Sequence, residues 1–267
     1  LIVYKISATE CLIIVNASRI EADWAWMKSQ TTGFAVELED RSPQYGIIAV
    51  QGPRAVEVSA SIAAELPTVG RFRFTRLDIA GQEVFAARTG YTGEDGFEFI
   101  APNETLPQLW KKLYAAAGKF TPFSACGLGA RDSLRLEAAY PLWGHELDET
   151  ITPIETNCSW VVKLQKPDFT GKRALEALKA KGLARKLFGF AAIAPGPVAR
   201  QGATVRDASG KPIGVITSGT FSPTLNKPIA LGFIDNNHWD LKIVELEMNG
   251  RRLQAEVSAL PFYKRPV

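Results

Sequence analysis

The pattern of the chain changes at Gly182, and this change limits the possible folds more than any other feature of the 267 residues. From residue 187 onward, short alternating runs of apolar and polar residues are separated by turn-forming sequences: Pro195-Gly196-Pro197, Ser209-Gly210, Ser218-Gly219 and Asn249-Gly250. Closely spaced turns of this kind are typical of a β-sandwich or β-barrel. We therefore predict a domain boundary at 182–186 and an all-β module over 183–267, in which Asn249-Gly250 forms a type I′ hairpin turn.

Before this boundary, helix-like and strand-like patterns alternate along the chain. Strand patterns cover 1–7, 10–17, 34–39, 45–50, 71–87 and 97–100, and helical patterns cover 18–29, 54–66, 106–117, 129–139 and 169–181. Apolar residues spaced by three and four mark the helices, and alternation or short apolar runs mark the strands. The mixture predicts an α+β fold, with a small α+β part over 1–41, more of which is expected before Leu1, and a central α+β domain over 42–182.

Composition narrows the class of protein. Hydrophobic residues make up 46% of the chain and charged residues 22%, which is an ordinary balance for a globular protein. The net charge is +3 and the basic residues are scattered, so nucleic-acid binding is not predicted. No apolar run approaches the ~18–20 residues that a membrane span requires, and the N-terminus lacks the features of a signal peptide.

The cysteines and histidines are too few and too scattered for a metal site. Cys11, Cys126 and Cys158 are an odd number without a CxxC spacing, which argues against a disulfide framework and against zinc or iron–sulfur ligation. His145 and His238 lie far apart in the sequence. We therefore expect no metal, and a reducing compartment: the bacterial cytoplasm, or the mitochondrial matrix if the source is eukaryotic.

A glycine-rich segment, Arg88–Glu98, is the first candidate for a ligand site. Its glycines at 90, 93 and 96 stand between two strand-like runs, and glycine permits both positive φ and close backbone approach. The segment presents Tyr91 and Glu98, and Glu98 is predicted to point away from its neighbours Phe97 and Phe99. A plain glycine hairpin with a solvated glutamate is the alternative.

A second polar cluster, Gly127–Glu137, is the other candidate. Arg131 and Arg135 stand four residues apart on a predicted helix, near Asp132. Helix N-termini bind anions, and the glycines at its start would let a ligand approach. An intrahelical ion-pair network, worth a few tenths of a kcal/mol per pair, is the alternative. Of the two arginines, we interpret Arg135 as structural.

These two segments belong to an ordered set of motifs. The others are Val15-Asn-Ala-Ser18, Ile151-Thr-Pro-Ile-Glu155, Asp168-Phe-Thr-Gly-Lys172, Thr217-Ser-Gly-Thr-Phe-Ser-Pro223 and Pro261-Phe-Tyr-Lys-Arg265. In this order, from Leu1 to Val267, the chain resembles the T-protein (aminomethyltransferase) family of the glycine cleavage system. The resemblance implies mixed α/β folate-binding domains over 1–182, the first ferredoxin-like and incomplete at its N-terminus. A C-terminal β-barrel or jelly-roll-like domain would follow them.

The resemblance also implies the ligand residues. They are Asn16, Tyr91, Glu98, Arg131, Trp143 and Arg265. A carboxylate at Glu98 would accept two parallel, charge-assisted hydrogen bonds from the amidine-like edge of a pterin, and the Asn16 amide would serve its other groups. Tyr91, Arg131 and Trp143 would contact the remainder of folate, and Arg265 the active site and the lipoyl arm.

Each of these residues has an ordinary structural alternative. Asn16 could be a helix cap, with Ser18 as a competitor. Tyr91 and Trp143 could be core aromatics, and Arg265 a charge on a terminal tail. Around Asn16 the chain departs from the family, because Arg19 and Ala22 stand where Asn and Lys are more frequent.

The activity that the resemblance implies is part of one-carbon metabolism and glycine catabolism. The methylene of S-aminomethyl-dihydrolipoyl H-protein would pass to tetrahydrofolate as co-substrate, with release of ammonia. The catalytic residue is unknown, because the family's aspartate is expected before Leu1 and neither Asp23, Asp95 nor Asp132 matches it. The alternatives are another folate-dependent demethylase on this scaffold, a non-catalytic folate-binding homologue, and a pseudoenzyme. Lipoylated H-protein and folate are the expected partners.

Overall fold

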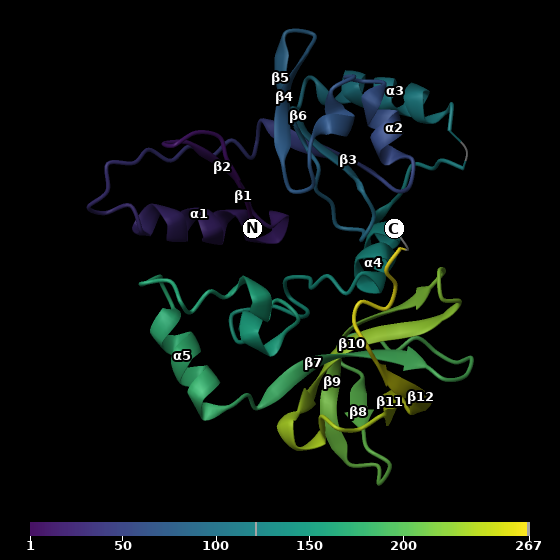
Figure 1. Ribbon diagram of the computed structural model, residues 1–267. Helices are drawn as coiled ribbons and strands as arrows, with labels where there is room; N and C mark the ends of the chain where they lie inside the picture. The colour runs from purple at the N-terminus through teal and green to yellow at the C-terminus, as the bar shows by residue number, and fades with distance from the viewer. Residues whose placement is uncertain (121, 266–267) are drawn as a thin grey trace. The chain divides into compact units, whose positions relative to one another are not determined.

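The computed structural model describes residues 1–120 and 122–265, which form two compact units (Figure 1). Unit 1 consists of Leu1–Gly90 and Glu94–Ala125, and unit 2 joins Tyr91–Gly93 to the chain from Cys126 onward. The predicted three-part division at 41 and 182 stays a prediction. Within the described residues, no helix combines the length and the apolar character needed to cross a membrane.

Unit 1 is an α+β structure. Its elements are β1 (Ile2–Lys5), β2 (Cys11–Ile14), η1 (Ala17–Arg19), α1 (Ile20–Ser29), β3 (Tyr45–Gln51), α2 (Ala55–Ala60), η2 (Leu66–Thr68), β4 (Phe74–Ile79), β5 (Gln82–Ala87), β6 (Gly96–Pro102) and α3 (Leu106–Ala117). Strands β3-β6-β5-β4 form an antiparallel sheet in that order, and β1 and β2 form a separate hairpin. Helices α2 and α3 cover one face of the larger sheet (Figure 1).

Alternation along β5 and β6 divides the larger sheet into two buried faces. Ala86, Phe97 and Phe99 pack with the helices in one core cluster. The intervening residues Ala87 and Ile100 pack with Tyr4 of the hairpin in another. Because successive side chains of a strand point to opposite faces, Glu98 lies on the face that the hairpin shares. The predicted direction of Glu98 is therefore confirmed.

Two expectations for unit 1 are wrong. Residues 34–39, all of which the structure describes, form no strand, and Phe34 is 71% exposed. An alternating run needs a partner strand, and none lies beside this segment among the described residues. The helix predicted over 54–66 ends at Ala60. Leu66 instead reaches the core in the separate turn η2, which contains Pro67, and a proline disfavours α-helix in the residue before it.

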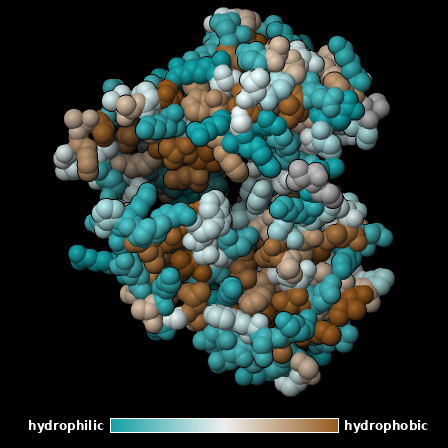
Figure 2. Space-filling view, in the orientation of Figure 1, coloured by the Kyte–Doolittle hydropathy of each residue, from teal (hydrophilic) through white to brown (hydrophobic). Residues whose placement is uncertain are grey.

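Apolar side chains are exposed on the hairpin of unit 1. Leu1, Ile2 and Val3 are 71%, 40% and 59% exposed. Figure 2 shows apolar surface gathered over this part of the molecule.

Unit 2 combines helices with a closed barrel. Its elements are α4 (Leu128–Glu137), η3 (Pro153–Glu155), η4 (Ser159–Val161), α5 (Lys172–Lys181), β7 (Arg185–Ala192), β8 (Thr204–Arg206), β9 (Pro212–Ser222), β10 (Lys227–Asp235), η5 (Asn236–His238), β11 (Ile243–Met248) and β12 (Arg251–Ser258). The strands close in the order β10-β7-β12-β11-β8-β9. The predicted C-terminal β-module is confirmed, and its first strand begins at Arg185.

The barrel has an apolar interior and an apolar patch on its wall. Phe190, Val205 and Ile213 are among the buried residues of the interior. Leu136 of α4 and Ala139, two residues after the end of that helix, pack against the outer side of the wall. Asn249 and Gly250 have φ values of 53° and 72° between β11 and β12, as the type I′ prediction requires.

Candidate functional site

The glycine-rich turn is built by close backbone approach. A Cβ on Gly90 would stand 1.9 Å from the Gln51 amide oxygen, and one on Gly96 would stand 2.2 Å from the Val50 carbonyl oxygen. The Gln51 amide nitrogen fills this space and donates to the carbonyls of Thr89, at 3.0 Å, and Phe97, at 3.3 Å. Gln51 thus braces both sides of the turn. This role of Gln51 was not predicted, although Gln51 is the last residue of β3 and directly precedes Gly52-Pro53.

An ion pair closes the base of the same turn. The Arg88 guanidinium donates to both oxygens of Asp95, at 3.0 and 2.6 Å, and to the Val69 carbonyl at 2.7 Å. Hydrogen bonding to Arg88 lowers the pKa of Asp95 despite the opposing effect of burial. Both residues belong to the predicted glycine-rich segment, but their pairing was not predicted.

Glu98 is a half-buried carboxylate with a defined orientation. Thr89 donates its hydroxyl to Glu98 Oε2 at 2.5 Å, and the Tyr4 hydroxyl lies 3.2 Å from Thr89 Oγ1. Burial, with a smaller contribution from the negative charge of Glu98, raises the pKa of Tyr4. A carboxylate that is oriented by one hydroxyl and placed among apolar residues can accept further donors from a planar ligand.

Asn16 lies at the end of β2, at the cap position of η1. It is exposed, and within the described chain its side chain forms no capping hydrogen bond. The Arg19 amide instead donates to the Asn16 carbonyl at 2.8 Å. The alternative in which the Asn16 side chain caps the following helix is therefore not supported.

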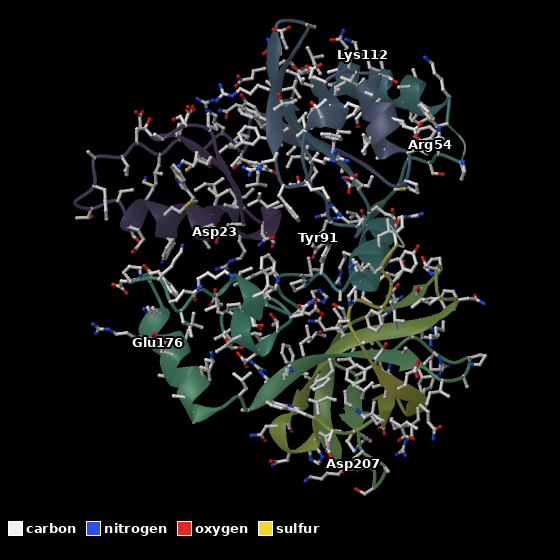
Figure 3. The ribbon with its side chains drawn as sticks, in the orientation of Figure 1. Asp23, Arg54, Tyr91, Lys112, Glu176 and Asp207 are labelled. Carbon is white, nitrogen blue, oxygen red and sulfur yellow. The ribbon has the colours of Figure 1, made fainter. Side chains whose placement is uncertain are left out.

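The second candidate cluster assembles around Tyr91 in unit 2, beside α4 (Figure 3). The Arg131 guanidinium lies 4.9 Å from the centre of the Tyr91 ring. The Tyr140 ring stacks against the Tyr91 ring, with 5.6 Å between the two ring centres. The Tyr91 hydroxyl donates to the Pro141 carbonyl at 2.5 Å. Burial is the largest cause that raises the pKa of Tyr91 to about 12. The structure thus brings Tyr91 and the exposed Arg131 together.

Arg135, which we interpreted as structural, is part of a buried network. Its side chain is 2% exposed and pairs with Asp132 at 2.7 Å and with Glu146 at 3.0 Å. Sequence reasoning did not anticipate Glu146, which is fully buried. Its neighbour His145 was predicted only not to be a metal ligand.

Trp143 and Arg265 lie on two other segments of unit 2. Trp143 is half-buried and forms an isolated bridge with Leu147. Arg265 is exposed, two residues after Tyr263, whose amide donates to the Glu137 carbonyl at 3.1 Å. Within the described residues, no group of three His, Cys, Asp or Glu side chains is arranged to hold a metal ion.

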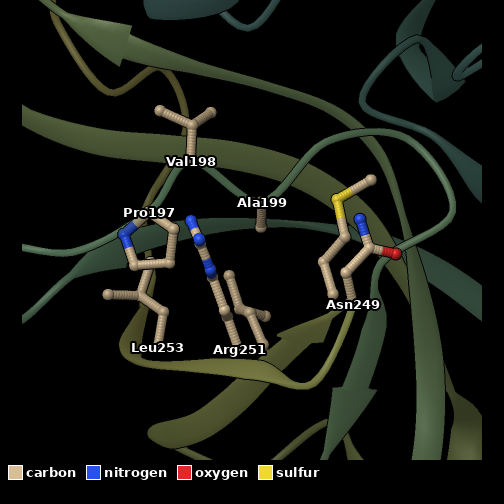
Figure 4. A pocket seen from close by; sticks show the side chains of 8 residues that line it. Pro197, Val198, Ala199, Asn249, Arg251 and Leu253 are labelled. Carbon is tan, nitrogen blue, oxygen red and sulfur yellow. The ribbon is translucent and has the colours of Figure 1, made fainter.

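A depression of about 400 Å³ opens at the surface of the barrel (Figure 4). It is lined by Pro197, Val198, Ala199, Leu246, Met248, Asn249, Arg251 and Leu253. The lining includes none of the predicted ligand residues. It offers Arg251 and Asn249 but no carboxylate for the donor edge of a pterin, so it is not a candidate for pterin recognition.

Comparison with known proteins assigns the chain to a family. A family model described as the GCVT N-terminal domain matches residues 1–166, and one described as the glycine cleavage T-protein C-terminal barrel domain matches residues 185–264. The aminomethyltransferase of Thermosipho melanesiensis is 42% identical over 269 residues, and that of Desulfitobacterium hafniense strain DCB-2 is 41% identical over 267 residues. These alignments cover 100% and 99% of this chain and 72% of each relative.

A solved structure supports the same assignment. The glycine cleavage system aminomethyltransferase T from Bartonella henselae superposes with a TM-score of 0.81 and 32% identity, over 93% of this chain and 67% of that one. The chain therefore belongs to the aminomethyltransferase, or glycine cleavage T-protein, family.

Proposed function

We propose that this protein transfers the methylene of S-aminomethyl-dihydrolipoyl H-protein to tetrahydrofolate, with release of ammonia. The observation that carries the proposal is the match of both family domains, in order, with about 40% identity to aminomethyltransferases along the whole chain. The products are 5,10-methylenetetrahydrofolate, ammonia and dihydrolipoyl H-protein. The bacterial cytoplasm or the mitochondrial matrix is the corresponding location.

Glu98 is the proposed pterin-reading residue. Its carboxylate is half-buried and oriented by Thr89, so it can accept two parallel N–H donors from the pterin edge. Asn16 is assigned to the same ring because its exposed amide offers both a donor and an acceptor. Since partial burial weakens screening by water, such charge-assisted bonds are stronger here than on an open surface.

Tyr91, Arg131 and Trp143 are the proposed contacts for the benzoyl region of folate. The ring of Tyr91 and the guanidinium of Arg131 already form one contact surface in unit 2. A flat aromatic ring beside a cation suits an aromatic ligand that carries an anionic tail. Arg265 is assigned to the lipoyl arm. Holding both substrates in place can lower the barrier by several kcal/mol, because the entropy of bringing them together has already been lost.

The test of this function is ammonia release by the full chain. We expect release to require both tetrahydrofolate and aminomethylated H-protein. Glu98→Gln should weaken tetrahydrofolate affinity by roughly 10- to 100-fold, because one charge-assisted pairing contributes about 1.5–3 kcal/mol. Glu83→Gln, on the exposed part of β5, is the matched control and should leave affinity unchanged.

Two results would contradict the proposal. One is demethylation of a small donor in the absence of H-protein, which would indicate a different folate enzyme on this scaffold. The other is unchanged tetrahydrofolate affinity in Glu98→Gln, which would remove the assigned pterin contact.

A further inference from the structure

A buried ion pair lies behind the Tyr91 surface of unit 2. Arg135 and Glu146 are 2% and 0% exposed, and Arg135 Nη1 lies 3.0 Å from Glu146 Oε2. Neither is among the predicted ligand residues. Desolvation offsets most of the attraction in a buried pair, so stability alone is a weak reason for its presence.

Both oxygens of Glu146 are used. Oε2 accepts from Arg135 and from the backbone amide of Leu142, at 2.9 Å. Oε1 accepts from the Thr217 hydroxyl at 2.5 Å. One carboxylate therefore ties the chain at Leu142 to helix α4 and to strand β9.

Arg135 holds the same stretch of backbone at a second point. Its Nη1 also donates to the Tyr140 carbonyl at 3.3 Å, while Nη2 donates to Ser218 Oγ at 2.9 Å. The Tyr140 carbonyl and the Leu142 amide are thus both fixed by the ion pair. Pro141 lies between these two points.

The fixed backbone carries the contact that orients Tyr91. The carbonyl of Pro141 accepts the Tyr91 hydroxyl at 2.5 Å, and the Tyr140 ring stacks on Tyr91. The Arg131 guanidinium lies 4.9 Å from the centre of the same Tyr91 ring. A shift of residues 140–142 would therefore free the Tyr91 ring, which Arg131 contacts.

We propose that Arg135 and Glu146 are positioning residues that hold Tyr91 and Arg131 in the arrangement that binds folate. The inference rests on the proposed function, since it names what sets the affinity of that site for tetrahydrofolate. Loss of the pair loosens residues 140–142, frees the Tyr91 hydroxyl and weakens folate binding. Affinity for the aminomethyl donor does not depend on this contact.

The experiment compares Glu146→Gln with a matched control in the full chain. Glu155 is also a buried carboxylate that pairs with an arginine, Arg185 at 2.9 Å, and accepts a backbone amide, that of Thr152 at 2.7 Å. Glu155→Gln therefore makes the same chemical change at a different place. Tetrahydrofolate affinity is measured by titration calorimetry, and backbone mobility by hydrogen–deuterium exchange. Both variants are also made in a Tyr91→Phe background.

The expected result is specific to Glu146. Glu146→Gln accelerates exchange in 140–147 and weakens tetrahydrofolate binding by about 10-fold, but by less than about 3-fold when Tyr91 is already Phe. Such non-additivity arises when two residues act through one contact. Glu155→Gln leaves affinity within about 2-fold. If Glu146→Gln does not fold, Thr217→Val keeps the ion pair and should show the same pattern at about 3-fold.

Several outcomes would overturn the inference. They are unchanged affinity in Glu146→Gln, an equal loss in both Tyr91 backgrounds, or the same loss in Glu155→Gln. Failure of the wild-type chain to bind tetrahydrofolate would instead refute the proposed function. Normal wild-type binding with unchanged Glu146→Gln affinity refutes only the positioning role.

Discussion

At the scale of single residues, the polar groups around the glycine turn are arranged in pairs. Thr89 orients Glu98 at 2.5 Å, and Arg88 grips Asp95 with two nitrogens. Bidentate pairing of a guanidinium with a carboxylate fixes direction as well as distance. The turn therefore presents Glu98 from a backbone that is fastened at its base.

The Arg88–Asp95 pair predicts a pH dependence of stability. Hydrogen bonding to Arg88 lowers the pKa of Asp95 in the folded state. The stabilisation is therefore fully present above the unfolded pKa, about 4, and is lost as the pH falls through the lower folded pKa. We expect Asp95→Asn to be less stable than wild type at pH 7 and to show a shallower loss of stability below about pH 4.

Urea unfolding between neutral and acidic pH would measure this slope. Asp240→Asn, at an exposed position, serves as control and should keep the wild-type slope. Parallel curves for wild type and Asp95→Asn would show that the pair does not contribute.

At the scale of elements, the C-terminal segment is fastened to strand β7 and helix α4. A Cβ on Gly189 would stand 2.6 Å from Leu260 Cδ2 and 2.9 Å from Phe262 Cζ. Both side chains pack against the barrel wall, and the Tyr263 amide bonds to the last residue of α4. The glycine in β7 therefore makes room for the segment that leads to Arg265.

Gly189→Ala is predicted to displace this segment. Overpacking at such a contact destabilises by about 1–3 kcal/mol. If Arg265 contacts the lipoyl arm, KM for aminomethylated H-protein should rise more than KM for tetrahydrofolate. Unfolding and steady-state kinetics measure the two effects.

Gly118→Ala is the control for this prediction, because its Cβ would have only ordinary contacts at 3.6 Å. It should change stability by less than about 1 kcal/mol. A Gly189→Ala variant as stable as wild type would show that the segment is not held closely at β7.

At the scale of the whole molecule, the proposed binding of tetrahydrofolate would be linked to stability. A ligand that binds only the folded chain stabilises it by about 2.7 kcal/mol at 100 times its Kd. We expect tetrahydrofolate to raise the Tm of the wild-type chain, and to raise that of Glu98→Gln less at the same concentration. Differential scanning calorimetry over a series of ligand concentrations checks this, and equal shifts in both proteins would contradict it.

The local sequence pattern was enough to predict an element wherever the residues of that element follow a helical or strand periodicity. The apolar face of 106–117 predicted α3 with its observed bounds, and alternation at 97–100 predicted the direction of Glu98. Pattern failed at 34–39, where an alternating run has no neighbouring strand, and beyond Ala60, where a turn replaces the helix. A strand exists only through its partner, which its own residues do not specify.

By itself, the sequence determined the kind of most elements, the barrel after Gly182 and the family, because periodicity, turn residues and motif order are local and linear properties. Only the tertiary structure decided that Glu146 is buried against Arg135 and Thr217, which are 11 and 71 residues away. Burial and hydrogen-bond partners depend on which distant segments meet, and the free energy of a buried charge depends on both its desolvation and those partners. For that reason the sequence could nominate Tyr91 and Arg131, while the fold supplied the residues that hold them.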